Sequence, residues 1–390
     1  MLSVLANRTY RQLFLAQVIA LVGTGLATVA LGLLAYDIAG ADAGAVLGTA
    51  MAIKMIAYIG VAPIVGAYAN RLPRRAFLIA MDVIRCLVAL ALPFVDQVWQ
   101  IYILIFVLQS ASAGFTPTFQ ATIPDVLPEE KDYTRALSLS RLAYDMESLT
   151  SPMLAAALLT VMNFHWLFSG TAIGFACSAL LVLTTTLPRS SAHNSGGGIY
   201  DNTTRGARLY LKTPRLRGLL AVTLAAAAAS AMVIVNTPVL VQAALGLGQR
   251  EVAITLAAFG GGSMLAALLL PRLLERLSDR KVMLSAASVM TVALAVLALT
   301  WRGHASPGYW GVILAGWLVL GIAYSASITP GGRLLRRSSA EEDRPALFAA
   351  QFALSHVCWL IAYPLAGQVG ALEGMGIAFG ATAALALIGT

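Results

Sequence analysis

Charged residues are scarce in this chain. Lysine, arginine, aspartate and glutamate make up 11% of its 390 residues, whereas a typical soluble domain carries about 25%. Hydrophobic residues make up 59%, and the mean hydropathy is +0.80. A soluble fold of this size cannot hide so much apolar surface from water. The composition therefore excludes a soluble protein and predicts an integral membrane protein.

Several chemical signatures are also missing. The three cysteines, at positions 86, 177 and 358, lie in apolar segments without paired spacing, so neither a disulfide framework nor a zinc module is indicated. The chain has no Gly-x-x-x-x-Gly-Lys-Ser/Thr stretch and no His-Glu-x-x-His or Gly-x-Ser-x-Gly motif. These absences argue against an ATP-driven pump and against a membrane enzyme. We expect no cofactor, and energy from an ion gradient, with a proton gradient as the first expectation.

Long apolar segments follow one another along the whole chain. About 20 residues of helix, rising 1.5 Å each, cross a hydrocarbon core of about 30 Å. We expect membrane-spanning helices near residues 10–36, 44–69, 75–95, 98–122, 136–162, 166–187, 216–244, 250–275, 281–301, 308–331, 345–369 and 371–390. The sequence therefore predicts an all-α integral membrane fold with twelve transmembrane helices.

Basic residues gather on one side of these expected helices. Most of the 26 lysines and arginines fall in alternate connections, while the opposite connections hold only Arg250 and Arg302. Because cytoplasmic loops of membrane proteins are enriched in Lys and Arg, this pattern places both the N and the C terminus in the cytoplasm. The net charge of +8 follows from that topology, and no nucleic-acid partner is needed to explain it.

A polar segment divides the chain into two similar parts. Residues 188–215 begin with Pro188, continue through a Ser- and Gly-rich stretch, and have the composition of a flexible, solvated connection. They separate residues 1–187 from residues 216–390, each with six expected helices. Landmarks recur in the same order in both parts: a Thr-Pro pair, an acidic pair and a Pro before small residues. Such a parallel repeat resembles the major facilitator transporters, whose two six-helix bundles rock around a central site.

The connection after the second expected helix strengthens this resemblance. Its residues from Gly66 to Arg75 resemble the superfamily's Gly-x-x-x-Asp-Arg-x-x-Arg-Arg signature, with Asn70 in place of the Asp. The family's Asp helps to latch the two halves at the cytoplasmic side, so the resemblance implies a gating loop in which that charge is missing. The alternative is that the loop only orients the helices by charge. The gating residues would be Gly66, Asn70, Arg71, Arg74 and Arg75.

A branch of the superfamily is indicated by shorter segments. Residues 150–156, Thr-Ser-Pro-Met-Leu-Ala-Ala, resemble a degenerate Gly-Pro-x-x-Gly-Gly motif of exporters. Together with residues 82–85 and 135–152, they look most like the bacterial exporters that include enterobactin exporters and macrolide efflux pumps. The resemblance implies a monomer in the bacterial inner membrane that moves a small molecule outward. A helix-packing role for the proline and small residues is the alternative.

Charged residues inside the expected helices are the main functional candidates. Each costs about 2.5 to 3.5 kcal/mol on insertion scales and is expected to face a bundle interior or a water-filled cavity. Arg141 and Asp145 are four residues apart and can pair on one helix face, while Glu147 lies on another face near mid-membrane depth. We expect Asp145 or Glu147 to carry the coupling proton. The alternative is a static structural pair.

Residues on other helices are candidates for a substrate cavity. The implied fold brings the second and eleventh helices together, so that Lys54 and His356 share a cavity with Arg141. His356 and Cys358 point about 200° apart on a helix, so they do not form a metal site together. Polar or aromatic contacts are expected at Gln109, Asn236 and Tyr324, unless these residues serve only helix packing.

These observations predict a secondary active exporter in the lipid bilayer. We expect it to move small amphipathic molecules by proton antiport and alternating access. A siderophore or metal-chelate exporter is one alternative, and a lysolipid flippase or a direct metal-ion exporter is another.

Overall fold

The computed structural model describes residues 2–39, 43–68, 72–187, 199–301 and 307–390, and the regular secondary structure in these ranges is helical. Six long helices come from the first part of the chain: α1 (Arg8–Ala39), α2 (Ala43–Tyr68), α3 (Arg74–Ala91), α4 (Val98–Val126), α5 (Glu130–Leu159) and α6 (His165–Leu183). Six more come from the second: α8 (Pro214–Pro238), α9 (Gln249–Arg276), α10 (Asp279–Thr300), α11 (Trp310–Ile328), α13 (Arg344–Leu372) and α14 (Met375–Ile388).

Short helices connect or extend the long ones. They are η1 (Leu2–Ala6), η4 (Leu92–Phe94), α7 (Ile199–Lys212), η5 (Val239–Ala244), η6 (Pro307–Tyr309) and α12 (Gly331–Arg337). Among the described residues, nine helices are long and apolar enough to cross a membrane. The apolar parts of α2 and α14 are shorter, and α5 carries several charged residues along its 30 residues. With these three, the prediction of twelve transmembrane helices is confirmed.

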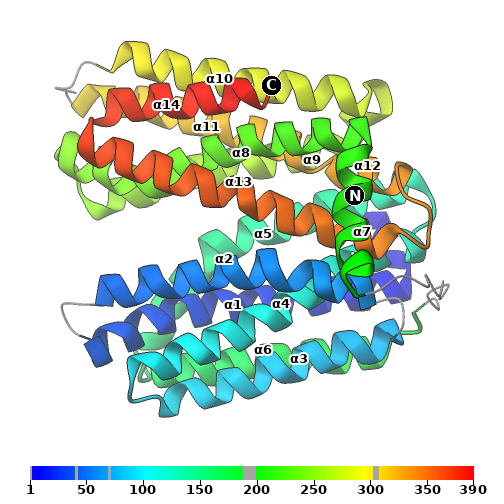
Figure 1. The fold of residues 1–390 in the computed structure, drawn as a ribbon. Coiled ribbons are helices and arrows are strands. Elements are labelled where there is room, and N and C mark those ends of the chain that lie inside the picture. The colour runs from blue at the N-terminus through cyan, green and yellow to red at the C-terminus, as the bar shows by residue number, and fades with distance from the viewer. Residues whose placement is uncertain (1, 40–42, 69–71, 188–198, 302–306) are drawn as a thin grey trace.

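The long helices form two bundles that lie side by side (Figure 1). In the first bundle α1 and α3 pack on α6, and α2 packs on α4; in the second α9 packs on α11, α10 on α14, and α8 on α13. The bundles meet along two seams, where α2 contacts α13 and α5 contacts α9. Helix α13 also contacts α4 of the first half.

Apolar residues cover both the inside and the outside of the bundles. In α8 the run from Ala225 to Ala229 is fully buried, because small side chains let neighbouring helices approach closely. Large side chains such as Leu87, Ile173 and Leu299 are exposed on the outer surface. A helix that is apolar all round is stable only where hydrocarbon replaces water, which is the physical reason these sequences form a membrane bundle.

Part of the predicted flexible connection is ordered as a helix. Residues 188–198 lie outside the described residues, but Ile199–Lys212 form α7, which packs against α2, α8 and α13. The composition of this segment suggested a solvated chain because several of its residues are charged or polar. Tyr210 of this segment is instead fully buried, and its hydroxyl donates to Gln351 of α13.

Two glycines permit the close contact between α9 and α11. A Cβ added at Gly262 would collide with the carbonyl oxygen of Leu318, and one added at Gly321 would collide with the carbonyl oxygen of Phe259. The backbones of the two helices therefore touch at two reciprocal points. This contact holds α9, which forms part of a seam between the halves, against the body of its own bundle.

We expect Gly321→Ala to lower the melting temperature of the purified protein, because forcing a methyl group into a close backbone contact costs about 1–3 kcal/mol. The measurement is thermal unfolding in detergent, followed by tryptophan fluorescence. Gly261→Ala is the matched control, since nothing lies within 4 Å of a Cβ added at that position of α9. Equal melting temperatures for the two variants would contradict the close-packing interpretation.

Candidate functional site

A polar cluster lies on the seam between α5 and α9. Arg141 and Asp145 form an ion pair on one face of α5, with Arg141 Nε 3.3 Å from Asp145 Oδ2. Ser263 of α9 joins the pair: its Oγ donates to Asp145 Oδ2 at 2.6 Å and accepts from Arg141 Nε at 3.1 Å. The Arg141 guanidinium lies over the ring of Tyr324 in α11, 4.7 Å from its centroid. Asp145 is 4% exposed; Arg141 of the same helix supplies its counter-charge, and Ser263 of the other half supplies a hydrogen bond.

An aromatic cluster lies on the opposite seam, between α2 and α13. The ring of Tyr58 packs edge-on against His356 at 4.6 Å between centroids, and it lies 4.9 Å from the ring of Phe352. Lys54 Nζ is 5.5 Å from the centroid of the Tyr58 ring. His356 Nδ1 lies 2.7 Å from the carbonyl oxygen of Phe352, which only accepts, so this nitrogen carries the proton. The structure thus brings Lys54 and His356 together through Tyr58.

Glu147 lies between α1, α2 and α5, apart from the Arg141 pair. It is half-buried and interacts electrostatically with Lys54. A Cβ added at Gly25 of α1 would lie 2.5 Å from Glu147 Oε1, so the absence of a side chain at Gly25 makes room for this carboxylate. The two carboxylates of α5 therefore have different surroundings: Asp145 is buried in an ion pair, and Glu147 faces a less enclosed space beside Lys54.

Gln109 and Asn236 are two further candidates named in the sequence analysis. Gln109 is half-buried in α4. Asn236 is 2% exposed, and its Nδ2 donates to the carbonyl oxygen of Ala366 at 3.0 Å, which joins α8 to α13 within the second half. This hydrogen bond matches the packing alternative given for Asn236.

The gating loop is described in part. Asn70 and Arg71 lie outside the described residues, and Gly66 is in the last turn of α2. Arg75 is exposed at the start of α3, whereas Arg74 is buried and pairs with Asp125 of α4. Arg74 is therefore the residue of this loop that the structure connects to another helix.

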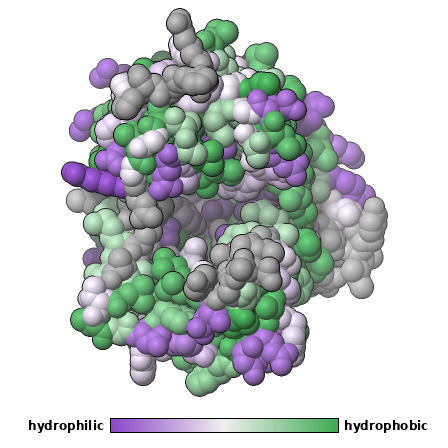
Figure 2. All heavy atoms as spheres, turned by 90° about the vertical axis from the view of Figure 1, so that its left-hand side faces the viewer, coloured by the Kyte–Doolittle hydropathy of each residue, from purple (hydrophilic) through white to green (hydrophobic). Residues whose placement is uncertain are grey.

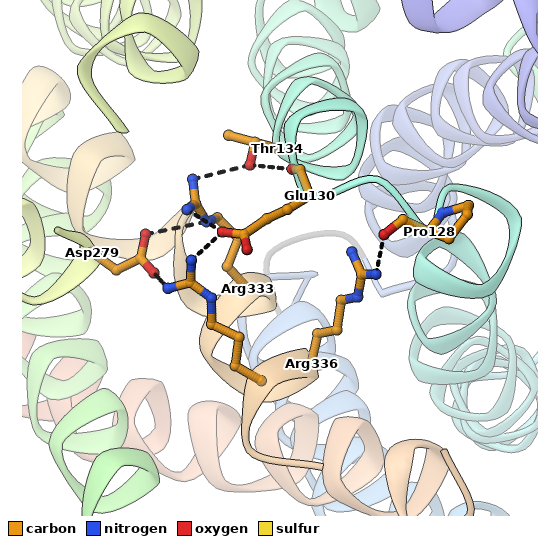
Figure 3. Close-up of polar contacts among 7 residues, drawn as sticks. Pro128, Glu130, Thr134, Asp279, Arg333 and Arg336 are labelled. Atoms are coloured by element: carbon orange, nitrogen blue, oxygen red, sulfur yellow. Dashed lines mark hydrogen bonds and ion pairs between the residues drawn. The ribbon is translucent and has the colours of Figure 1, made fainter. Parts of the chain in front are cut away.

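An ion-pair cluster joins the cytoplasmic ends of the two halves (Figure 3). Glu130, at the start of α5, pairs with both Arg333 and Arg337 of α12. Asp279, at the start of α10, is 3.2 Å from Arg333 Nε and 2.6 Å from Arg337 Nη1. Thr134 Oγ1 accepts a hydrogen bond from Arg333 Nη1 at 3.0 Å. Two arginines of the second half are thus held between carboxylates from both halves.

A second ion-pair cluster has the opposite charge pattern. Asp125, near the end of α4, pairs with Arg74 of its own half and with Arg344 at the start of α13 in the other half. Here one carboxylate lies between two arginines. Both clusters are at the ends of the helices where the basic connections lie, so they hold the cytoplasmic ends together.

The opposite end of the molecule is open between the halves. Figure 2 views this outer end and shows a recess between the two bundles. The arrangement is closed at the cytoplasmic side and open at the outer side.

Sequence reasoning missed several residues of this site. Tyr58 follows Lys54 by one helical turn, and Phe352 precedes His356 by one turn, so helical spacing from the two candidates was the available signal. Glu130 and Arg333 were visible only as charges in cytoplasmic connections. Their pairing depends on which helix ends meet, and no local pattern reports that.

Comparison with known proteins identifies the family and the fold. The family model for the Major Facilitator Superfamily matches residues 13–248 and 219–390. The human organic anion transporter MFSD10 (TETRAN) superposes with a TM-score of 0.83 at 13% identity, covering 98% of both chains. A bacterial homologue of the iron transporter ferroportin, in an outward-facing state, superposes with a TM-score of 0.80 at 16% identity, covering 98% of this chain and 97% of that one.

One sequence relative is the macrolide efflux protein A of Enterococcus faecalis. It is 25% identical over 153 residues, which cover 37% of this chain and 47% of the relative. The match therefore spans less than half of that protein. The family model, in contrast, covers both halves of this chain, and the structural matches extend over the whole fold. The chain belongs to the Major Facilitator Superfamily and is a multi-pass membrane transporter of small molecules, not an enzyme.

Proposed function

We propose that this protein is a secondary active exporter of small amphipathic molecules, driven by proton antiport across a bacterial cytoplasmic membrane, and that it acts as a monomer. The relationship to macrolide efflux protein A supports the outward direction. The degenerate exporter motif at residues 150–156 supports it as well. The observation that carries the coupling proposal is Glu147, a half-buried carboxylate at mid-membrane depth beside Lys54.

The proposed cycle begins with the arrangement described above. The recess admits protons and releases cargo at the outer side, while the ion pairs of Glu130 and Asp125 keep the cytoplasmic side closed. To open inward, the protein has to separate Arg333 from Glu130 and Arg344 from Asp125. Rocking of two rigid halves around a central site accomplishes both separations in one motion.

Glu147 is the proposed proton carrier. When it is ionised, its charge attracts Lys54 across the gap between α5 and α2. Protonation of Glu147 removes that attraction. The cargo therefore binds with different affinity when Glu147 is protonated and when it is ionised. This difference in affinity between the two states is what drives exchange. Asp145 has a second role in the proposal: its pair with Arg141 and its bond with Ser263 hold the α5–α9 seam.

The aromatic cluster supports an amphipathic cargo. Tyr58, Phe352 and His356 form a wall of rings beside the ammonium group of Lys54, and Trp359 extends it along α13. Ligand sites in proteins combine apolar and aromatic linings with a few polar groups that set orientation. Flat apolar parts of a cargo would pack on the rings, and a polar part would contact Lys54 or Glu147.

An anionic chelate such as a siderophore is the second candidate cargo. Lys54 favours it, because this half-buried cation lies beside the aromatic ring of Tyr58, whereas the charge of Arg141 is neutralised by Asp145. Proteoliposomes loaded with macrolides, lipophilic cations or siderophores distinguish the candidates. Loss of siderophore efflux in Lys54→Gln with cation efflux retained would favour the chelate.

We expect Glu147→Gln to abolish the response of efflux to an imposed pH gradient in proteoliposomes, because an amide cannot bind and release the coupling proton. Exchange of cargo at equal pH should continue, since the rings of Tyr58, Phe352 and His356 are unchanged and glutamine still offers a polar contact of the same size. Asp145→Asn is the matched variant on the same helix, and we expect it to retain the pH response. Gradient-driven efflux by Glu147→Gln at the rate of the unmodified protein would overturn the assignment.

We expect Arg333→Ala to shift the protein away from the outward-open arrangement. Removing Arg333 breaks its pair with Glu130, which crosses between the halves, and leaves Arg337, whose side chain is 46% exposed, as the remaining shared partner of Glu130 and Asp279. Lys131→Gln is the control, because the Lys131–Glu275 pair also joins the halves but its side chains are 60% and 51% exposed. Exposed pairs contribute about 0–1 kcal/mol.

The shift is measured as the distance between spin labels at the outer ends of the halves. Asp96→Cys and Arg250→Cys provide exposed label positions. The native thiols are first replaced by alanine, at Cys86, Cys177 and Cys358. We expect a shorter distance population in Arg333→Ala and little change in Lys131→Gln. Identical distance distributions in both variants would show that this cluster does not hold the cytoplasmic side closed.

A further inference from the structure

Helix α7 (Ile199–Lys212) is placed where it touches both halves of the transporter. It runs across the cytoplasmic ends of the spanning helices (Figure 1) and packs against α2 of the first half and α8 and α13 of the second. The α2–α13 pair is also one of the two seams between the halves. Anything that holds α7 in place therefore acts on this seam.

The inner face of α7 is seated on α13 by specific contacts. A Cβ added at Gly206 would collide with the carbonyl oxygen of Ala346, so the two backbones touch there. Tyr210 is fully buried, and its hydroxyl donates to Gln351 Oε1. These contacts fix the rotation of α7 about its axis, and so they determine which side chains point away from the bundle.

The outward side of α7 is basic. Arg205, Arg208, Leu209 and Lys212 line a pocket of about 210 Å³ together with Asp343, which precedes α13. Arg205 Nη2 is 2.7 Å from Asp343 Oδ1, so this carboxylate orients one of the three cations. Arg208 and Lys212 are exposed. The pocket thus holds three positive groups and one negative group, a net charge that suits an anionic ligand.

Apolar surface continues from this pocket toward the membrane. Leu211, next to Lys212, is 47% exposed, and Ile64 near the cytoplasmic end of α2 is 49% exposed. A helix that presents basic side chains beside exposed apolar ones lies in the headgroup region of a bilayer. The cytoplasmic leaflet carries anionic lipids, and basic pockets between helices on that side bind their headgroups.

We propose that the pocket formed by Arg205, Arg208, Leu209, Lys212 and Asp343 binds the phosphate headgroup of an anionic phospholipid of the cytoplasmic leaflet. Arg208 and Lys212 contact the phosphate, and the acyl chains extend past Leu211. Because α7 touches both α2 and α13, the bound lipid stabilises the arrangement in which these helices are in contact. The lipid is a structural ligand, distinct from the transported cargo, and the inference is independent of the proton site.

The experiment compares the protein in nanodiscs of phosphatidylcholine alone and of phosphatidylcholine with phosphatidylglycerol. We expect phosphatidylglycerol to raise the melting temperature and to remain bound to the released protein in native mass spectrometry. The double variant Arg208→Gln, Lys212→Gln should lose the temperature shift and retain several-fold less lipid. The charge-conserving variant Arg208→Lys, Lys212→Arg should behave as the unmodified protein does, which shows that the fold tolerates substitution here.

The matched control removes the same charge elsewhere on the cytoplasmic side. Arg280→Gln, Lys281→Gln changes two exposed residues at the start of α10, outside the pocket, and should keep both the temperature shift and the bound lipid. Equal loss in this control would show a general charge effect and overturn the site. A shift of the same size with inorganic phosphate in phosphatidylcholine discs would also overturn it, because the ligand would then be free phosphate.

Discussion

An ionisable side chain at the centre of a membrane-spanning helix costs about 2.5–3.5 kcal/mol on insertion, and this cost governs where the protein carries charge. In α3, Arg85 pairs with Asp82 and lies 4.1 Å from the centroid of the Phe115 ring, so its charge is compensated within the first half. In α5, Arg141 and Asp145 compensate each other's charge. The hydroxyl of Ser263 in the other half donates a hydrogen bond to Asp145, so the ion pair also contacts the second bundle.

Charges are also paired at the cytoplasmic ends, where water is nearby. The pairs form two patterns. Around Arg333 the order of charges is acid, base, acid, from Glu130 to Asp279; around Asp125 it is base, acid, base, from Arg74 to Arg344. In each cluster the central residue contacts one partner from its own half and one from the other. Opening the cytoplasmic side therefore separates Glu130 from Arg333 and Arg337, and Asp125 from Arg344, whereas the pairs of Asp279 with Arg333 and Arg337 and of Asp125 with Arg74 stay within one half.

In the proposed mechanism, three regions of the protein have separate roles in transport. The aromatic wall on the α2–α13 seam offers a surface for cargo, and Glu147 beside Lys54 places a titratable group next to it. The α5–α9 seam is held by the pair of Arg141 and Asp145. At the cytoplasmic surface, α7 crosses the first of these seams, where lipids can act on it without entering the cargo path. These proposals assign coupling, closure and lipid response to different side chains, so mutation can separate them.

The amino-acid sequence by itself determined the class of protein, the twelve spanning helices, their orientation and the Arg141–Asp145 pair. Each of these depends on neighbours along the chain: apolar runs of fixed length, loop charges, and a spacing of one helical turn. Only the tertiary structure decided that Glu130 meets Arg333, 203 residues away, and that Tyr58 joins Lys54 to His356. It also decided that α7 is a seated helix, because Tyr210 is buried only when α13 supplies the opposing surface. Local sequence patterns indicate which face of a helix is buried and where it carries charge, but they do not indicate which other helix packs against it.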